Sequence, residues 1–265
     1  MIFQLIGTFF ICIAATTIGA ISGVGGGVII KPVMDAVSGL AVSQISFLSG
    51  CTVLAMSTVS LLRSRGGSVK VDPRKGTLLA VGAAIGGLLG KSWFEWVKVA
   101  SGNDGLVGTV QSILMILLTG GVLVYVLNKN RIHTKQVESA IGCIAIGLFL
   151  GILSSFLGIG GGPINLAVLY YFFSMDTKTA ALNSIYIILF SQITSLASTF
   201  VGGTVPTVDV AMLAAMVVGG VSGGFLGSSL GKKMDNAAVD TLFRWLLVVI
   251  TLISCYNLWQ YAAMM

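Results

Sequence analysis

The sequence predicts an all-α polytopic membrane protein, and three observations support that prediction. Only 9% of the 265 residues are charged, against about a quarter in an ordinary soluble domain. Mean hydropathy is +0.99 and arises from apolar runs long enough to cross a hydrocarbon core. These runs are apolar in both phases of a two-residue alternation, which disfavours the strands of a membrane β-barrel. We therefore expect an integral, multi-pass protein of the plasma (cytoplasmic) membrane.

Ten apolar segments are predicted as helices, and two of them are too short to span a bilayer. The short segments, 28–37 and 163–174, each follow a cluster of glycines. A continuous helix through three consecutive glycines is unfavourable, since each Gly costs about 1 kcal/mol relative to Ala. A break is therefore expected before each short helix. The longer segments are 3–22, 41–62, 76–97, 106–128, 139–157, 179–201, 208–230 and 241–262.

An internal repeat relates the two parts of the chain. GVGGGVII, which begins at Gly23, matches GIGGGPIN, which begins at Gly158, at an offset of 135 residues. Further pairs keep a similar register: Ser49 with Ser184 at 135, and Gly82, Gly86, Gly87 and Gly90 with Gly219, Gly223, Gly224 and Gly227 at 137. We predict two transmembrane repeats, residues 1–135 and 136–265. Each repeat would hold a glycine-broken helical hairpin plus three spanning helices, giving 8–10 helical segments in total.

The charge pattern predicts that the two repeats are inverted. The loop at 63–75 carries five Lys or Arg residues, whereas its counterpart at 202–208 carries none. Cytoplasmic loops are enriched in Lys and Arg, so equivalent loops would lie on opposite sides of the membrane. The number of crossings after the basic loop at 129–138 stays open. Either all three following segments cross, or 139–157 and 163–174 form a re-entrant hairpin and only 179–201 spans.

The glycine clusters have two interpretations. A helix that starts after a break presents free N–H groups and a partial positive charge, which favours an anion, and transporters with inverted repeats use such half-helices to bind substrate. The alternative is close helix packing. We favour the anion site for the clusters themselves and packing for the glycines spaced by four. The residues of the predicted anion site in the clusters are Gly25, Gly26, Gly27, Gly160, Gly161 and Gly162.

Polar residues near the breaks are further candidates for substrate binding. Lys31 would be expensive at membrane depth and is therefore a functional hypothesis, although it could instead pair with Asp35 four residues on. Neutral side chains could donate hydrogen bonds to anionic oxygens or bond another helix instead. They are Ser49, Asn165, Asn183, Ser184 and Gln192.

Several chemistries lack the residues that they need. His133, the one histidine, falls in a basic loop, so no histidine at membrane depth is available for a catalytic Ser–His pair or a metal site. The four cysteines are single, with no CxxC, so a zinc site is not indicated. No GxxxxGK[ST] sequence occurs, so ATP hydrolysis by a P-loop is not supported. We expect no catalytic residue, no metal site and no cofactor, and hence no enzyme.

The paired segments GVGGGVIIKP and GIGGGPINLAVL, with glycine-rich later helices, resemble the TauE/SafE family of sulfite and organosulfonate exporters, also called the toluene sulfonate uptake permease family. The resemblance covers nearly the whole chain. Members often have Pro a few residues beyond each glycine cluster. Pro32 fits this pattern, but Ala167 stands at the corresponding position of the second repeat and Pro163 follows the glycines directly. The two half-sites are therefore expected to be unequal.

The resemblance implies a secondary transporter that moves small sulfur-containing anions, such as sulfite or sulfoacetate, by alternating access. Two alternatives are kept: a passive channel for the same anions and a membrane scaffold subunit without transport. The expected partners are a small anionic substrate and membrane lipid. A homodimer is compatible with the sequence, and nucleic acid is not an expected partner because the positive charge lies in loops.

Overall fold

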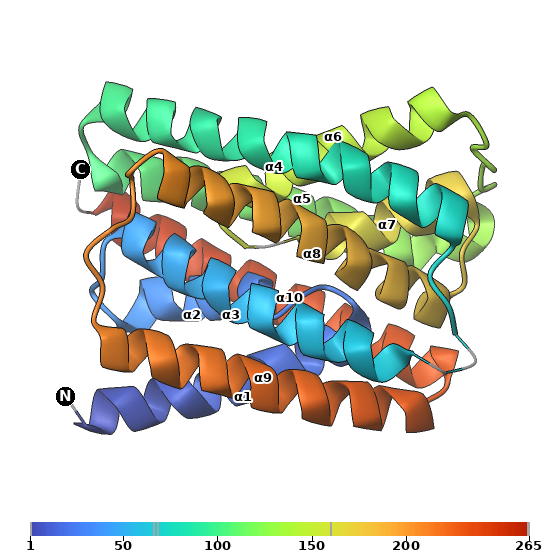
Figure 1. Cartoon of the computed structure of the whole chain (residues 1–265), viewed down its shortest axis with the longest axis horizontal. Coiled ribbons are helices and arrows are strands. Elements are labelled where there is room, and N and C mark those ends of the chain that lie inside the picture. The colour runs from blue at the N-terminus through green and yellow to red at the C-terminus, as the bar shows by residue number, and fades with distance from the viewer. Residues whose placement is uncertain (1, 66, 68, 160, 264–265) are drawn as a thin grey trace.

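The computed structural model describes residues 2–65, 67, 69–159 and 161–263, which form ten α-helices and one short 3-10 helix (Figure 1). Among these residues no strand occurs, and the predicted all-α polytopic fold is confirmed. The helices are α1 (Ile2–Ser22), α2 (Gly27–Val37), α3 (Val42–Ser64), α4 (Pro73–Ser101), α5 (Asp104–Asn128), η1 (Lys129–Arg131), α6 (Ala140–Leu157), α7 (Pro163–Phe173), α8 (Thr177–Val201), α9 (Val210–Lys233) and α10 (Asn236–Ala262).

Eight of these helices are long and apolar enough to cross a membrane, whereas α2 and α7 have 11 residues each. Eleven residues rise about 16 Å, roughly half of a hydrocarbon core. The predicted helix boundaries agree within a few residues. Helix α10 begins five residues before the apolar segment 241–262, and α4 extends further in both directions than the apolar segment 76–97. The Asp72 carboxylate caps its first turn, and Gly102 ends it in a left-handed conformation.

Both short helices return to the end of the bundle from which their hairpin started. In the second hairpin, the N–H groups of Lys135 and Val137, which precede α6, donate to the carbonyls of Tyr171 and Phe172 at the end of α7. The start of α6 and the end of α7 therefore lie together. Both arrangements that the sequence left open share this feature, and the 11-residue length of α7, too short to cross a hydrocarbon core, favours the re-entrant one. The α1–α2 hairpin enters from the opposite end (Figure 1).

The packing of the two repeats follows an approximate two-fold relation. Helix α4 packs along α6 as α9 packs along α1, and α3 packs on α9 as α8 packs on α4. Helices α5 and α10 pack on each other and on the half-helices α7 and α2 respectively. The long helices of each repeat thus pack against the helical hairpin of the other repeat. The predicted inverted repeats, each a broken hairpin plus three long helices, are present in this arrangement.

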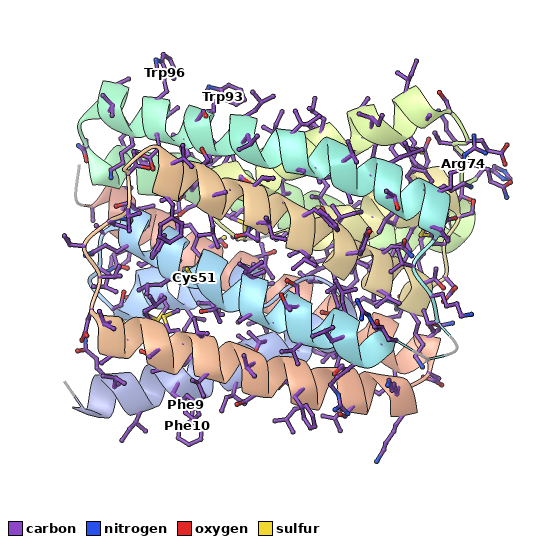
Figure 2. All side chains as sticks on the ribbon, viewed as in Figure 1. Phe9, Phe10, Cys51, Arg74, Trp93 and Trp96 are labelled. Carbon is purple, nitrogen blue, oxygen red and sulfur yellow. The ribbon has the colours of Figure 1, made fainter. Side chains whose placement is uncertain are left out.

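The two ends of the bundle differ in composition. The segments 69–72 and 129–139 lie at one end, called here the basic end, where Arg74 projects (Figure 2). The counterpart segment 202–209 lies at the other end, as the charge asymmetry predicted (Figure 1). Trp93 and Trp96 project near that second end, called here the tryptophan end (Figure 2).

Glycines spaced by four bring the helices together. A Cβ on Gly82, Gly86 or Gly90 would meet the carbonyl oxygens of successive turns of α6. On α9, a Cβ on Gly219 would lie 2.9 Å from the Cβ of Cys12 in α1, and Gly223 would meet Thr16. These contacts confirm that the glycines serve packing, since any side chain would separate the backbones.

We expect Gly86→Val to lower the free energy of unfolding by about 3 kcal/mol, because the branched side chain overpacks the backbone of Leu148 and Gly151. The matched control is Gly121→Val in α5, where an added Cβ meets no described atom within 4 Å. Thermal unfolding and gel filtration in detergent measure the difference. Equal stability of the two variants would contradict the assigned packing role.

Candidate functional site

The two glycine breaks meet near the middle of the bundle, where α2 and α7 begin (Figure 1). A Cβ on Gly27, the first residue of α2, would collide with the carbonyl oxygen of Ile159 in the second break. The same Cβ would lie 2.9 Å from the Oγ of Ser49 on α3. The start of one half-helix therefore touches the break before the other half-helix, and a serine hydroxyl lies at this contact. The contact between Gly27 and Ile159, with the starts of α2 and α7, is called here the junction.

Glycine is required within the breaks for both conformation and space. Gly25 has φ +82° and Gly161 has φ +123°, backbone angles that residues other than glycine rarely adopt. Gly161 also packs against Ile188 of α8, and Gly26 packs against Thr16 of α1. The predicted site residue Gly160 lies outside the described residues.

The two half-helices expose unequal sets of N–H groups. In α2 the first N–H groups belong to Gly27 and Val28, because the N–H groups of Ile29 and Ile30 already donate to the Gly26 carbonyl. In α7 the first residue, Pro163, has no N–H, so the first turn has one donor fewer. Each N-terminus still has the positive end of a helix dipole.

Two buried serines flank this junction at equivalent positions of the repeats. On α8, Ala181 contacts Gly23 of the first break and Ile188 contacts Gly161 of the second. Ser184 lies between these residues on the same helical face, since positions three and seven apart share a face. Ser49 and Ser184 are both fully buried, and among the described residues neither Oγ has a hydrogen-bond partner.

Asn165 in the first turn of α7 is also brought to the junction. Its Nδ2 would lie 3.4 Å from a Cβ on Gly161. Asn165 is 1% exposed, and its Oδ1 has no partner within the described part of the chain. Burying an unpaired polar group costs about 1–3 kcal/mol. Three of the unpartnered buried polar atoms of the described residues thus lie around one junction.

Lys31 lies one turn beyond Gly27 and forms an ion pair with Asp35, with 3.0 Å between Nζ and Oδ2. Both side chains are buried, and Asp35 Oδ1 has no other partner among the described residues. The sequence left a role in anion binding and a pair with Asp35 open, and the pair is present. The ammonium group therefore points along α2, away from the junction.

The two remaining predicted residues lie elsewhere. Asn183 accepts a hydrogen bond from the N–H of Asp72 and donates to the carbonyl of Thr179, so it holds the segment before α4. Gln192 lies two turns from Ser184 on α8 and lines a small cavity toward the tryptophan end. Neither side chain is at the junction itself.

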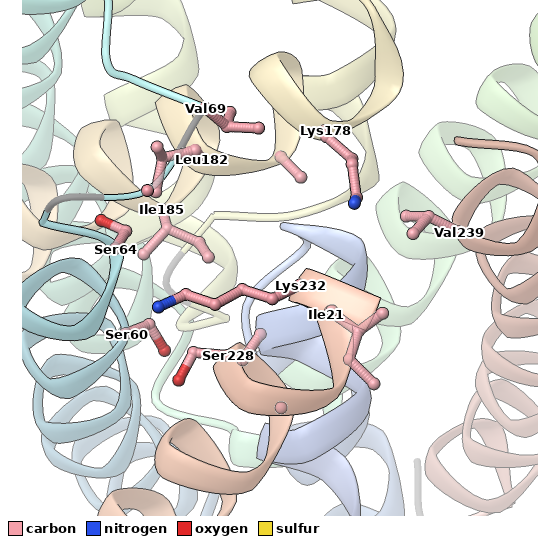
Figure 3. A pocket seen from close by; sticks show the side chains of 15 residues that line it. Ile21, Ser60, Ser64, Val69, Lys178, Leu182, Ile185, Ser228, Lys232 and Val239 are labelled. Atoms are coloured by element: carbon pink, nitrogen blue, oxygen red, sulfur yellow. The ribbon is translucent and has the colours of Figure 1, made fainter. Parts of the chain in front are cut away.

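A pocket of about 390 Å³ opens at the basic end and extends toward the first break (Figure 3). It lies between α1, α3, α8 and α9, and Ala181, the residue that touches Gly23, is part of its lining. Lys178 and Lys232 also line it. Neither lysine was among the predicted site residues, although a basic residue near a predicted helix end was a usable signal.

A second pocket at the basic end, of about 410 Å³, lies between α5, α7, α8 and α10. Its lining includes Lys129 and Asp240, which form an ion pair, and Thr177, whose hydroxyl donates to Asp240 at 3.0 Å. No residue in contact with a described glycine of the breaks lines it, whereas Ala181 lines the first pocket. We therefore assign it to the contacts that join α7 to α10 rather than to the junction.

An inverted-repeat helical bundle whose two half-helices meet at their N-termini has the architecture of a secondary transporter. The chain belongs to the sulfite exporter TauE/SafE family, whose family model matches residues 8–258. It is also 24% identical over 268 residues to the probable membrane transporter protein YunE of Bacillus subtilis (strain 168), covering 93% of this chain and 94% of that protein. No solved structure matches the chain significantly.

The family consists of membrane transporters rather than enzymes, so the chain is an integral, multi-pass membrane transporter. The family resemblance expected from the two glycine-rich segments is thereby confirmed.

We expect Lys31→Gln to destabilise the protein by about 3–5 kcal/mol, because it leaves a buried carboxylate unpaired. Adding Asp35→Asn should restore most of the stability. We expect anion affinity to stay reduced in this double variant, because the positive charge one turn from the junction is still missing. Thermal unfolding and anion binding are measured on the same preparations. Recovery of both properties would assign the pair to structure alone.

Proposed function

We propose that the protein transports small sulfur-containing anions, sulfite or organosulfonates such as sulfoacetate, by alternating access between the repeats 1–135 and 136–265. The observation that supports this most is the group of buried, unpartnered polar atoms on Ser49, Asn165 and Ser184 beside two helix N-termini. The hydroxyls of Ser49 and Ser184 can donate hydrogen bonds, as the oxygens of a sulfite or sulfonate group require, and Asn165 can do so through its Nδ2, whereas its Oδ1 only accepts.

The electrostatics of the junction favour an anion over a cation. Two helix N-termini point to one region, and each carries roughly half a positive charge. No carboxylate is among the described residues that form the junction contacts. Such a site binds charge through the backbone, so it would recognise the shape of a small oxyanion without a dedicated arginine. Lys31 adds positive charge one turn away in this proposal.

The pocket at the basic end supports alternating access. By the enrichment of Lys and Arg on the cytoplasmic side, the basic end is assigned to the cytoplasm. The pocket then gives the cytoplasm a path toward the first break, while its counterpart toward the tryptophan end, among the described residues, is a cavity of about 20 Å³ with room for about one water molecule. A pathway open at one end and closed at the other fits a transporter better than a passive channel.

The substrate is identified with a panel of sulfite, sulfoacetate, taurine and sulfate, tested for exchange in reconstituted vesicles. Saturable counterflow of one anion supports the proposal. If the anion only equilibrates across the membrane and never accumulates against its gradient, the protein is a passive channel. If no anion crosses, the protein is a scaffold.

We expect Ser49→Ala and Ser184→Ala each to weaken binding of the transported anion about tenfold or more, the loss expected for one hydrogen bond to a charged group. Thermal stability should stay the same or rise, because each Oγ that is removed has no partner among the described residues. Calorimetric titration and thermal unfolding measure the two properties.

The control is Ser92→Ala on the exposed face of α4, which removes a hydroxyl that donates to the Leu88 carbonyl. It should leave the affinity unchanged. Normal anion affinity in both the Ser49 and Ser184 variants would contradict a binding site at the junction.

A further inference from the structure

The small cavity at the tryptophan end and the large pocket at the basic end are lined by equivalent positions of the two repeats. Eight of the eleven residues that line the cavity have a repeat counterpart that lines the pocket, at offsets of 135 or 137 residues. Examples are Ser46 with Ala181, Phe47 with Leu182, and Ser195 with Ser60. The two spaces are therefore the same feature of the fold, present once in each orientation.

The two spaces differ mainly in how far they are open. The pocket has about 390 Å³ and its counterpart about 20 Å³. Inverted repeats in exchanged conformations would open the cavity and close the pocket. On this basis the cavity becomes the entrance from the tryptophan end in the other state of the transporter.

The cavity contains one feature that its counterpart position lacks, the ammonium group of Lys91. Ser228 occupies the equivalent position in the pocket. Lys91 is 8% exposed, and its Nζ lies 2.7 Å from Glu95 Oε1 and 4.9 Å from the ring centre of Phe94. A lysine on a lipid-facing surface would extend to the interface. Lys91 instead lines the interior with the hydroxyl-bearing Ser195 and Thr199.

The positive charge is therefore present at both ends, but at different positions of the repeat. In the pocket it comes from Lys178 and Lys232, whose counterparts are Ser43 and Glu95. At the tryptophan end it comes from Lys91. An ammonium in each space is what an anion pathway needs, since it lowers the cost of moving negative charge into a low-dielectric interior.

We propose that Lys91 binds the transported anion at the tryptophan end when the cavity opens, exchanging its Glu95 partner for an oxygen of the anion. This inference rests on the proposed transport of a small oxyanion and adds a second binding position on its path. In the closed state Glu95 neutralises the ammonium, which makes the buried charge tolerable. When the anion arrives it takes over this role, and the displaced Glu95 carboxylate, whose side chain is already 22% exposed, is released to the water of the opened cavity.

The test measures anion uptake from each face separately, in right-side-out and inside-out membrane vesicles, with the anion of the panel that the wild type carries. Lys91→Gln should raise the half-saturating concentration at the tryptophan face about tenfold, the loss expected for one charge-assisted hydrogen bond. Half-saturation at the basic face should change little. Lys98→Gln, which removes a charge from the same helix without lining the cavity, should change neither value.

Glu95→Gln distinguishes anion binding from a structural ion pair. It frees the ammonium group, so half-saturation at the tryptophan face should stay the same or fall. If Lys91 serves only to pair with Glu95, both single variants should be equally impaired and the double variant should recover. That result, or unchanged uptake by Lys91→Gln, overturns the assignment. A wild type that carries no anion of the panel overturns the proposed function and this inference with it.

The opening of the cavity is tested independently with Ser195→Cys and its counterpart Ser60→Cys on a background without the four native cysteines. An impermeant thiol reagent should modify the cysteine at position 195 from the tryptophan face and the cysteine at position 60 from the basic face. In a protein that carries both cysteines, modification of one should protect the other from the thiol reagent. Labelling of both positions from one face contradicts the equivalence of the two spaces.

Discussion

The contact between the two glycine breaks is the constraint on which the rest of the molecule depends. Gly27 and the Ile159 carbonyl approach so closely that any side chain at position 27 would separate them. Irregular backbone at membrane depth is tolerated only where protein or a water-filled cavity surrounds it. The breaks therefore need a complete shell of helices, and the same shell buries the hydroxyls of Ser49 and Ser184 without a hydrogen-bond partner among the described residues.

The glycine-rich long helices supply that shell. Gly82, Gly86 and Gly90 allow the backbone of α6 to pack closely against α4, and the glycines of α9 do the same for α1. Each hairpin therefore packs tightly along a long helix of the other repeat. Helix α3 contacts both breaks, through Ser49 at Gly27 and Ser46 at Gly158. Packing glycines and glycines at the breaks thus have separate roles, and the second depends on the first.

The sequence predicted the helices, the breaks and the inversion because each depends on local apolar length, glycine clusters or loop charge. It left open whether the α6–α7 segment spans or re-enters, since both give the same side for the next loop; α7 ends after 11 residues, about half of a hydrocarbon core, so it does not complete a crossing. Asn183 adjoins Ser184, but its side chain faces Asp72, which segment order alone does not reveal. Lys91 was missed because its repeat counterpart is Ser228, so the repeat gave no signal for a charge there.

The most direct test of the central claim is an anomalous diffraction map of crystals grown with selenite, a heavier analogue of sulfite. The account predicts a selenium peak between the N-termini of α2 and α7, within hydrogen-bonding distance of Ser49 and Ser184 through the anion's oxygens. The peak should disappear in the Ser49→Ala/Ser184→Ala variant. A peak confined to the pocket beside Lys178 and Lys232, with none at the junction, would contradict an anion site built from the two half-helices.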